Sequence, residues 1–113
     1  MQYINLTKYA ITLIDNKSNV MTIAPSGTVA VRNPTYSVRV SIDGLMPVHK
    51  KIYSGLLFFI NSKLVNFENN PNNIYLVEEI CLMGENTPTN FFAVTKEETD
   101  PQGNIRYAAL CTL

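Results

Sequence analysis

The run Val20-Met21-Thr22-Ile23-Ala24-Pro25-Ser26-Gly27-Thr28-Val29-Ala30-Val31-Arg32 is the most informative part of this chain. β-Branched residues alternate with other residue types on both sides of a Pro-Ser-Gly turn, which is the pattern of two strands joined at a corner. Proline presets the backbone at the first position of the turn, and Gly27 can adopt the positive φ that closes it. We therefore expect extended structure before and after residues 25–27.

The same signals recur along the chain. Apolar and β-branched runs are separated by polar turn segments at residues 15–19, 43–44, 68–73 and 100–104, and such segments bound strands rather than long helices. We predict a mainly β fold, with α+β left open. The fold is one domain over residues 1–113, built as a small antiparallel sheet, barrel or sandwich with at most one or two short helices.

Three segments have more specific patterns. Ser54 to Phe67 fits one long strand, a strand broken at Asn61-Ser62, or a short buried helix, because periodicity alone does not separate these structures. Glu78 to Met83 fits a short helix that Gly84 ends. Residues 35–42 alternate with period two, which predicts a strand with Tyr36, Val38, Val40 and Ile42 toward the core and Arg39 on the solvated face.

The composition limits the partners. Charged residues make up 16% of the chain, below the roughly 25% of typical soluble domains, so we expect a homo-oligomer whose contact surface is depleted of charge. Nine basic and nine acidic residues give no net field, which argues against binding to a nucleic-acid polymer. Met1 leads into a polar strand without a signal sequence, and the longest apolar run, residues 55–60, is too short for a membrane span.

The two cysteines, Cys81 and Cys111, lack the spacing of metal ligands and sit among apolar residues. We interpret them as buried free thiols of a cytoplasmic protein, with a disulfide as the alternative. The single histidine, His49, has no Asp or Ser beside it in the sequence, so no nucleophile and base pair is indicated. We expect no catalytic residue, no metal site and no cofactor.

Several short motifs resemble a widespread family of small phage and prophage proteins. They are Asn5-Leu6-Thr7 with Ala10-Ile11, the turn at residues 25–30, residues 48–55 around Tyr53, Ile74-Tyr75-Leu76-Val77 and Gly103-Asn104-Ile105. The chain has Lys8-Tyr9 where that family has Pro-His, and Gly84-Glu85-Asn86 where many members carry Arg-x-Asp. Members are often labelled sugar-bisphosphate phosphatases, but this chain has no Arg-His-Gly motif, and we do not expect that activity.

Small β-rich phage proteins of this kind are similar to those that sequester nucleotide second messengers of bacterial immunity, an analogy of function rather than a motif match. A nucleotide needs aromatic faces, cations and amides. We therefore predict an anti-defence protein of the infected host's cytoplasm that binds a cyclic or ADP-ribose-derived nucleotide without cleaving it. The predicted ligand-binding residues are Arg39, His49, Lys50, Tyr53, Asn90, Phe91, Arg106 and Tyr107.

Each of these residues also has a purely structural interpretation. The cluster His49-Lys50-Lys51 fits a solvated strand end as well as a phosphate site. Phe91 and Phe92 point to opposite faces of a strand, so one ring belongs to the core and the other to an oligomer contact or a stacking surface. The alternative function is a protein-interaction or virion-associated module that binds another protein and no small ligand.

Overall fold

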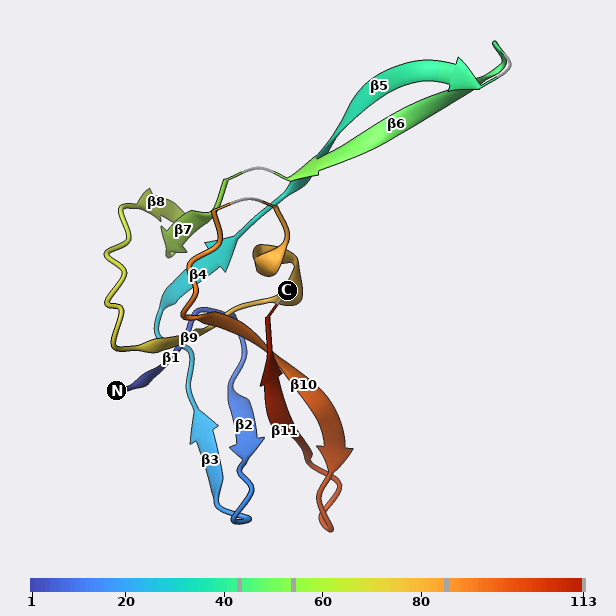
Figure 1. The fold of residues 1–113 in the computed structure, drawn as a ribbon. Coiled ribbons are helices and arrows are strands. Elements are labelled where there is room, and N and C mark those ends of the chain that lie inside the picture. The colour runs from blue at the N-terminus through green and yellow to red at the C-terminus, as the bar shows by residue number, and fades with distance from the viewer. Residues whose placement is uncertain (43, 54, 85, 113) are drawn as a thin grey trace.

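The computed structural model of the chain (Figure 1) describes residues 1–42, 44–53, 55–84 and 86–112, without the side chains of residues 35–42. The strands are β1 (Tyr3–Asn5), β2 (Ile11–Ile14), β3 (Val20–Ile23), β4 (Thr28–Val31), β5 (Pro34–Ile42), β6 (Met46–Tyr53), β7 (Leu57–Ile60), β8 (Lys63–Val65), β9 (Ile74–Leu76), β10 (Phe91–Thr99) and β11 (Ile105–Cys111). A 3-10 turn, η1 (Glu79–Leu82), is the helical element of this part of the chain. The predicted mainly β class is confirmed.

The largest sheet has six strands in the order β1-β9-β10-β11-β2-β3. The hairpins β2-β3 and β10-β11 are antiparallel, whereas β1 with β9, β9 with β10, and β11 with β2 pair in parallel. The antiparallel sheet expected from sequence is therefore mixed. Asn5 forms a bridge to Pro25, and the Ser26 amide donates to the Asn5 carbonyl over 2.9 Å. These contacts bring the two ends of the sheet together, so that it nearly closes on itself.

The predicted corner at residues 25–27 moves the chain from this sheet to another one. Gly27 has φ +97°, a conformation that favours glycine. The following strand, β4, joins a three-stranded sheet in the order β4-β7-β8. Asn61 and Ser62 connect β7 to β8 with φ of 49° and 65°, as a two-residue turn with positive φ at both positions requires. Of the three structures considered for residues 54–67, the broken strand is the one observed.

The main core lies between the two sheets. Its buried residues are Leu6, Ala30, Tyr75, Val77, Cys81, Leu82, Phe91 and Ala93. Phe58 and Phe67 stack with ring centroids 4.2 Å apart, and the Phe91 ring meets Phe58 edge-on at 6.2 Å. Both cysteines are free thiols; Cys81 is fully buried, as predicted, whereas Cys111, which was also predicted to be buried, is only partly so. No helix in the described part of the chain is long and apolar enough to cross a membrane.

The third sheet is an arm, formed by β5 and β6, that projects from the rest of the molecule (Figure 1). Its register runs from Pro34 opposite Tyr53 to Arg39 opposite Val48, and a bulge follows before Ile42. The arm raises the radius of gyration to 17.4 Å, compared with about 13 Å for a compact chain of this length. The sequence predicts that β5 covers the core, but the main neighbour of β5 is β6.

The Asn5-Leu6-Thr7 motif has a structural role. The Asn5 side chain is 1% exposed and makes four hydrogen bonds. Its amide donates to the carbonyl oxygens of Tyr9 at 2.7 Å and Ile23 at 3.0 Å, and its Oδ1 accepts from the Thr7 amide at 2.9 Å and the Thr7 hydroxyl at 2.6 Å. The motif therefore ties the turn after β1 to the end of β3, where the sheet closes.

Candidate functional site

Arg32 is a buried cation between the body and the arm. It follows β4, two residues after the buried Ala30, and its relative exposure is 3%. Its Nε donates to the Cys81 carbonyl at 3.2 Å and its Nη2 donates to the Thr87 hydroxyl at 3.4 Å. The guanidinium is thus held in a defined place by η1 and the segment that follows it.

Gly84 lies directly against this guanidinium. Its φ is +86°, and a Cβ added there would lie 2.8 Å from Arg32 Nη1 and 3.2 Å from Tyr53 Cβ. Both distances are shorter than ordinary van der Waals contacts. The absence of a side chain at residue 84 therefore allows the buried arginine and the last residue of β6 to approach each other.

A pocket of about 550 Å³ opens at this place, where the arm joins the body. It is lined by Arg32, Lys50, Lys51, Ile52, Tyr53, Gly55, Gly84 and Asn86, and we call it the basic pocket. The Lys51 ammonium lies 5.3 Å from the centre of the Tyr53 ring, within the range of a cation-π contact. The charged residues in the described lining, Arg32, Lys50 and Lys51, are all basic.

The basic pocket contains two of the predicted ligand-binding residues, Lys50 and Tyr53. His49 is exposed and precedes Lys50 in β6 without lining the pocket. Arg39 lies opposite Val48 in the arm, but its side chain is outside the described residues. The arm therefore brings part of the predicted cation cluster to the pocket.

Asn90 and Phe91 have structural surroundings. The Asn90 amide donates to Asn69 Oδ1 at 2.8 Å and to the carbonyl oxygens of Asn70 at 3.1 Å and Asn73 at 3.0 Å, which fixes the loop before β9. The Phe91 side chain is fully buried in the aromatic core, with 0% exposure. No ligand can stack on this ring, so the prediction of Phe91 as a binding residue is corrected to a core residue.

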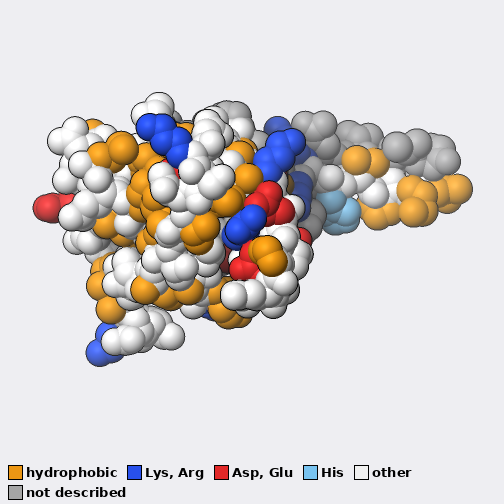
Figure 2. Space-filling model, turned by 90° about the horizontal axis from the view of Figure 1, so that it is seen from below, with side chains coloured by type: hydrophobic (Ala, Val, Ile, Leu, Met, Phe, Trp, Pro, Cys, Tyr) orange, Lys and Arg blue, Asp and Glu red, His pale blue; other side chains and the backbone are white. Residues whose placement is uncertain are grey.

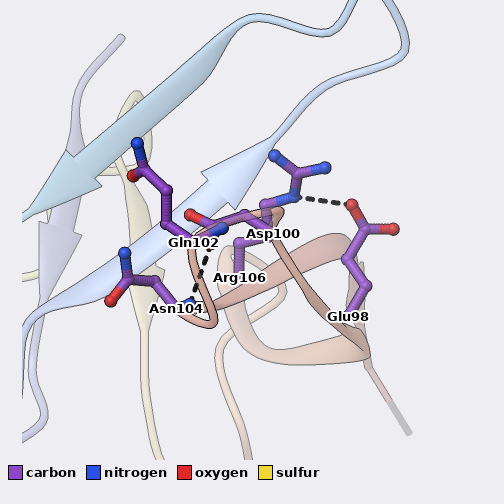
Figure 3. A network of polar contacts seen from close by, with 5 residues as sticks. All are labelled: Glu98, Asp100, Gln102, Asn104 and Arg106. Carbon is purple, nitrogen blue, oxygen red and sulfur yellow. Dashed lines mark hydrogen bonds and ion pairs between the residues drawn. The ribbon is translucent and has the colours of Figure 1, made fainter.

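Arg106 and Tyr107 lie on β11, which is at the other end of the molecule from the arm (Figure 1). Arg106 Nε donates to Glu98 Oε1 at 2.7 Å across the β10-β11 hairpin (Figure 3). Tyr107 is opposite Leu13 and lines two other cavities, of about 190 and 420 Å³. The predicted ligand residues therefore do not form one site, because these two are remote from the basic pocket.

Sequence reasoning missed Arg32, Gly84 and Asn86. Thr28, Ala30 and Arg32 share one face of an extended segment, so the buried Ala30 could have indicated an inward arginine. Asn86 has φ 62°, and no local sequence pattern indicated that it lines a pocket. The pocket forms from residues far apart in sequence, and only the fold brings them together.

Two observations concern the reactive chemistry of the described residues. Burial raises the pKa of the Cys81 thiol to about 11, so this cysteine is not a thiolate nucleophile at neutral pH. Among the described residues no group of three His, Cys, Asp or Glu side chains is arranged to hold a metal ion. Comparisons of the chain with protein-family models, curated proteins and solved structures find no match.

Proposed function

We propose that the protein binds a small phosphorylated nucleotide in the basic pocket and holds it without cleaving it. The observation that carries this proposal is the convergence of Arg32, Lys50, Lys51 and Tyr53 on one cavity. Its volume, about 550 Å³, falls within the range of roughly 300–1,000 Å³ that is typical of small-molecule sites.

The pocket residues fit the parts of a nucleotide. Guanidinium and ammonium groups form charge-assisted hydrogen bonds with phosphate oxygens. The partly exposed Tyr53 ring offers a face for a base, and the Asn86 amide offers a donor and an acceptor for a base edge. Together with the resemblance to phage proteins, this supports sequestration of a nucleotide immune messenger as the biological role. Such a protein lowers the free messenger concentration when its own concentration exceeds both the dissociation constant and the messenger concentration.

Calorimetric titration with a panel of cyclic dinucleotides, ADP-ribose and mononucleotides tests the proposal. We expect one of these to bind and to be recovered unchanged, by mass spectrometry, after heat denaturation of the complex. Tyr53→Ala should weaken binding by about 5-fold to 150-fold, the equivalent of the 1–3 kcal/mol of a base stack. Tyr53→Phe, which keeps the ring, should bind nearly as the parent does. Absence of binding by the parent to every member of the panel contradicts the proposal.

The lysines provide a second, matched comparison. Lys51→Ala removes a cation of the pocket, whereas Lys63→Ala removes an exposed cation of β8 that is not part of the pocket lining. We expect the first variant to lower affinity several-fold, more strongly at low salt than at high salt, and the second to leave it unchanged. Equal effects of the two substitutions would show a general charge effect rather than a site.

A protein-interaction function is the alternative that a specific observation favours. Leu45 and Met46, where the chain returns from β5 to β6, are 81% and 65% exposed. Large apolar side chains at such a position are typical of surfaces that contact another protein. A parent protein that binds no nucleotide but captures a defined protein partner through these residues would support this alternative.

A further inference from the structure

The arm has an apolar end and little support from its own chain. Figure 2 shows hydrophobic side chains at its far end, where Leu45 and Met46 lie, and the pale-blue histidine along its length. A two-stranded ribbon by itself is marginally stable in water, because it cannot cover its apolar side chains. The arm therefore gains stability from any surface that covers those side chains.

Charge is divided unequally between the arm and the rest of the chain. Residues 34–53 contain three basic residues and one acidic residue, whereas the remaining residues contain six basic and eight acidic. The arm is therefore positive and the body negative. A second copy of the same chain offers the complementary charge without any other partner.

The body has a groove that matches the arm in chemistry. This groove, of about 420 Å³, has a mixed polar and apolar lining that includes Ile11, Val77 and Ala93, and the exposed Glu78 and Glu79 give it an acidic rim. In the arm, Met46 and Lys50 are four residues apart on one strand, or about 13 Å. The cations of the arm thus match a groove whose rim carries two carboxylates. We call this cavity the acidic groove.

We propose that the arm of one copy packs into the acidic groove of a second copy, and that two copies exchange arms reciprocally. The arm points away from its own body (Figure 1), so the groove that it enters belongs to another molecule. This inference does not require nucleotide binding, because the arm tip and the acidic groove lie outside the basic pocket, although Lys50 of the arm also lines that pocket.

The expected contact area supports reciprocal exchange rather than a single contact. A ribbon of nine residues is about 30 Å long and about 10 Å wide, so one face covers about 300 Å². One arm in one groove then buries at most about 600 Å² in total, which is below the size of a stable interface. Two reciprocal contacts bury at most about 1,200 Å², the lower limit of stable protein interfaces.

The test is the mass in solution of the 113-residue chain and four variants, measured by light scattering after size exclusion. We expect the parent at twice the chain mass of 12.7 kDa. Met46→Asp at the arm tip and Glu79→Lys at the groove rim should each give the monomer mass. The controls Val20→Asp, at another exposed apolar position, and Glu68→Lys, at another exposed acidic one, should stay dimeric. Circular dichroism checks that every variant is folded.

A mixing experiment separates this arrangement from other dimers. The Met46→Asp chain keeps an intact groove, and the Glu79→Lys chain keeps an intact arm. Their mixture should form a one-to-one complex that is at least 10-fold weaker than the parent dimer, because only one of the two contacts is intact.

A parent protein that remains monomeric at about 100 μM overturns the proposal. Dissociation by Met46→Asp without any effect of Glu79→Lys overturns the assignment to the groove. A dimer that neither substitution weakens overturns the role of the arm. Nucleotide titration of the monomeric variants reports separately on the basic pocket.

Discussion

Replacing Asn5 with alanine tests how the large sheet closes. The substitution removes four hydrogen bonds made by a side chain that is 1% exposed. The Tyr9 carbonyl keeps a bond from the Thr7 hydroxyl at 3.0 Å, whereas the Ile23 carbonyl and the Thr7 amide lose a partner. At about 1 kcal/mol for each bond, the free energy of unfolding should fall by about 3–4 kcal/mol. For a chain of this length, this lowers the melting temperature by about 12–17 °C.

Thermal unfolding followed by circular dichroism measures this effect. The control is Asn16→Ala, which removes an exposed asparagine of the β2-β3 loop and should change the melting temperature by less than about 2 °C. Asn5→Asp adds a pH test, because a carboxylate would face the carbonyl oxygens of Tyr9 and Ile23 and can donate only when protonated. This variant should therefore be more stable relative to the parent at pH 4 than at pH 7. A small, pH-independent loss in both variants would refute the reasoning.

Three further perturbations have defined outcomes. Gly84→Ala should lower stability by about 1–3 kcal/mol in a urea titration, because the residue has positive φ and its Cβ would press on Arg32, and it should weaken ligand binding at the basic pocket. Phe91→Ala should cost about 3–5 kcal/mol in the same assay, as a fully buried ring does. Backbone amides lower the pKa of Asp15 and Asp100 by donating hydrogen bonds to their carboxylates. The two carboxylates therefore stabilise the fold above the unfolded-state pKa of about 3.9, and this stabilisation is lost as the pH falls through the folded-state values. The melting temperature of the variant with both residues changed to Asn should therefore fall less steeply between pH 7 and pH 2 than that of the parent.

The hairpins could be predicted from sequence because their information is local. The loops 15–19 and 100–104 both start with aspartate and end with asparagine, and the structure shows one geometry in both. The Asp15 carboxylate accepts from the amides of residues 17 and 19, and the Asp100 carboxylate accepts from the amides of residues 102 and 104 (Figure 3). Side-chain acceptors of this kind define a turn within a few residues. The strands on either side of each loop can be predicted from the alternation of apolar and polar residues.

The parallel pairings could not be predicted in the same way. β1 pairs with β9 although Tyr3 and its partner Ile74 are separated by most of the chain, and no turn connects them. Such pairing depends on which apolar faces pack together, and several arrangements satisfy the same alternation. Phe91 and Phe92 show the same limit, because successive residues of a strand point to opposite faces of the sheet. The pattern therefore predicts that only one of the two rings enters the core, but it does not predict which one.

The arm shows why alternation does not identify a core strand. Residues 35–42 alternate as a half-buried strand does, and a strand lying on its own core has the same pattern as one covered by another molecule. The structure places this strand in the projecting arm, where it pairs with β6. Which surface a strand packs on is therefore a property of the tertiary structure that the local pattern does not carry.

The position of the basic pocket links the arm to ligand binding. Lys50, Lys51 and Tyr53 belong to β6, whereas Arg32 and Gly84 belong to the body, so a ligand that contacts both groups joins the arm to the body at its base. Fixing the base of the arm restricts the directions in which its tip can point. A ligand bound there would therefore reduce the entropy that the arm loses when it enters a second molecule. If both proposals hold, nucleotide and dimer must each tighten the other by the same factor, since coupling free energies are reciprocal.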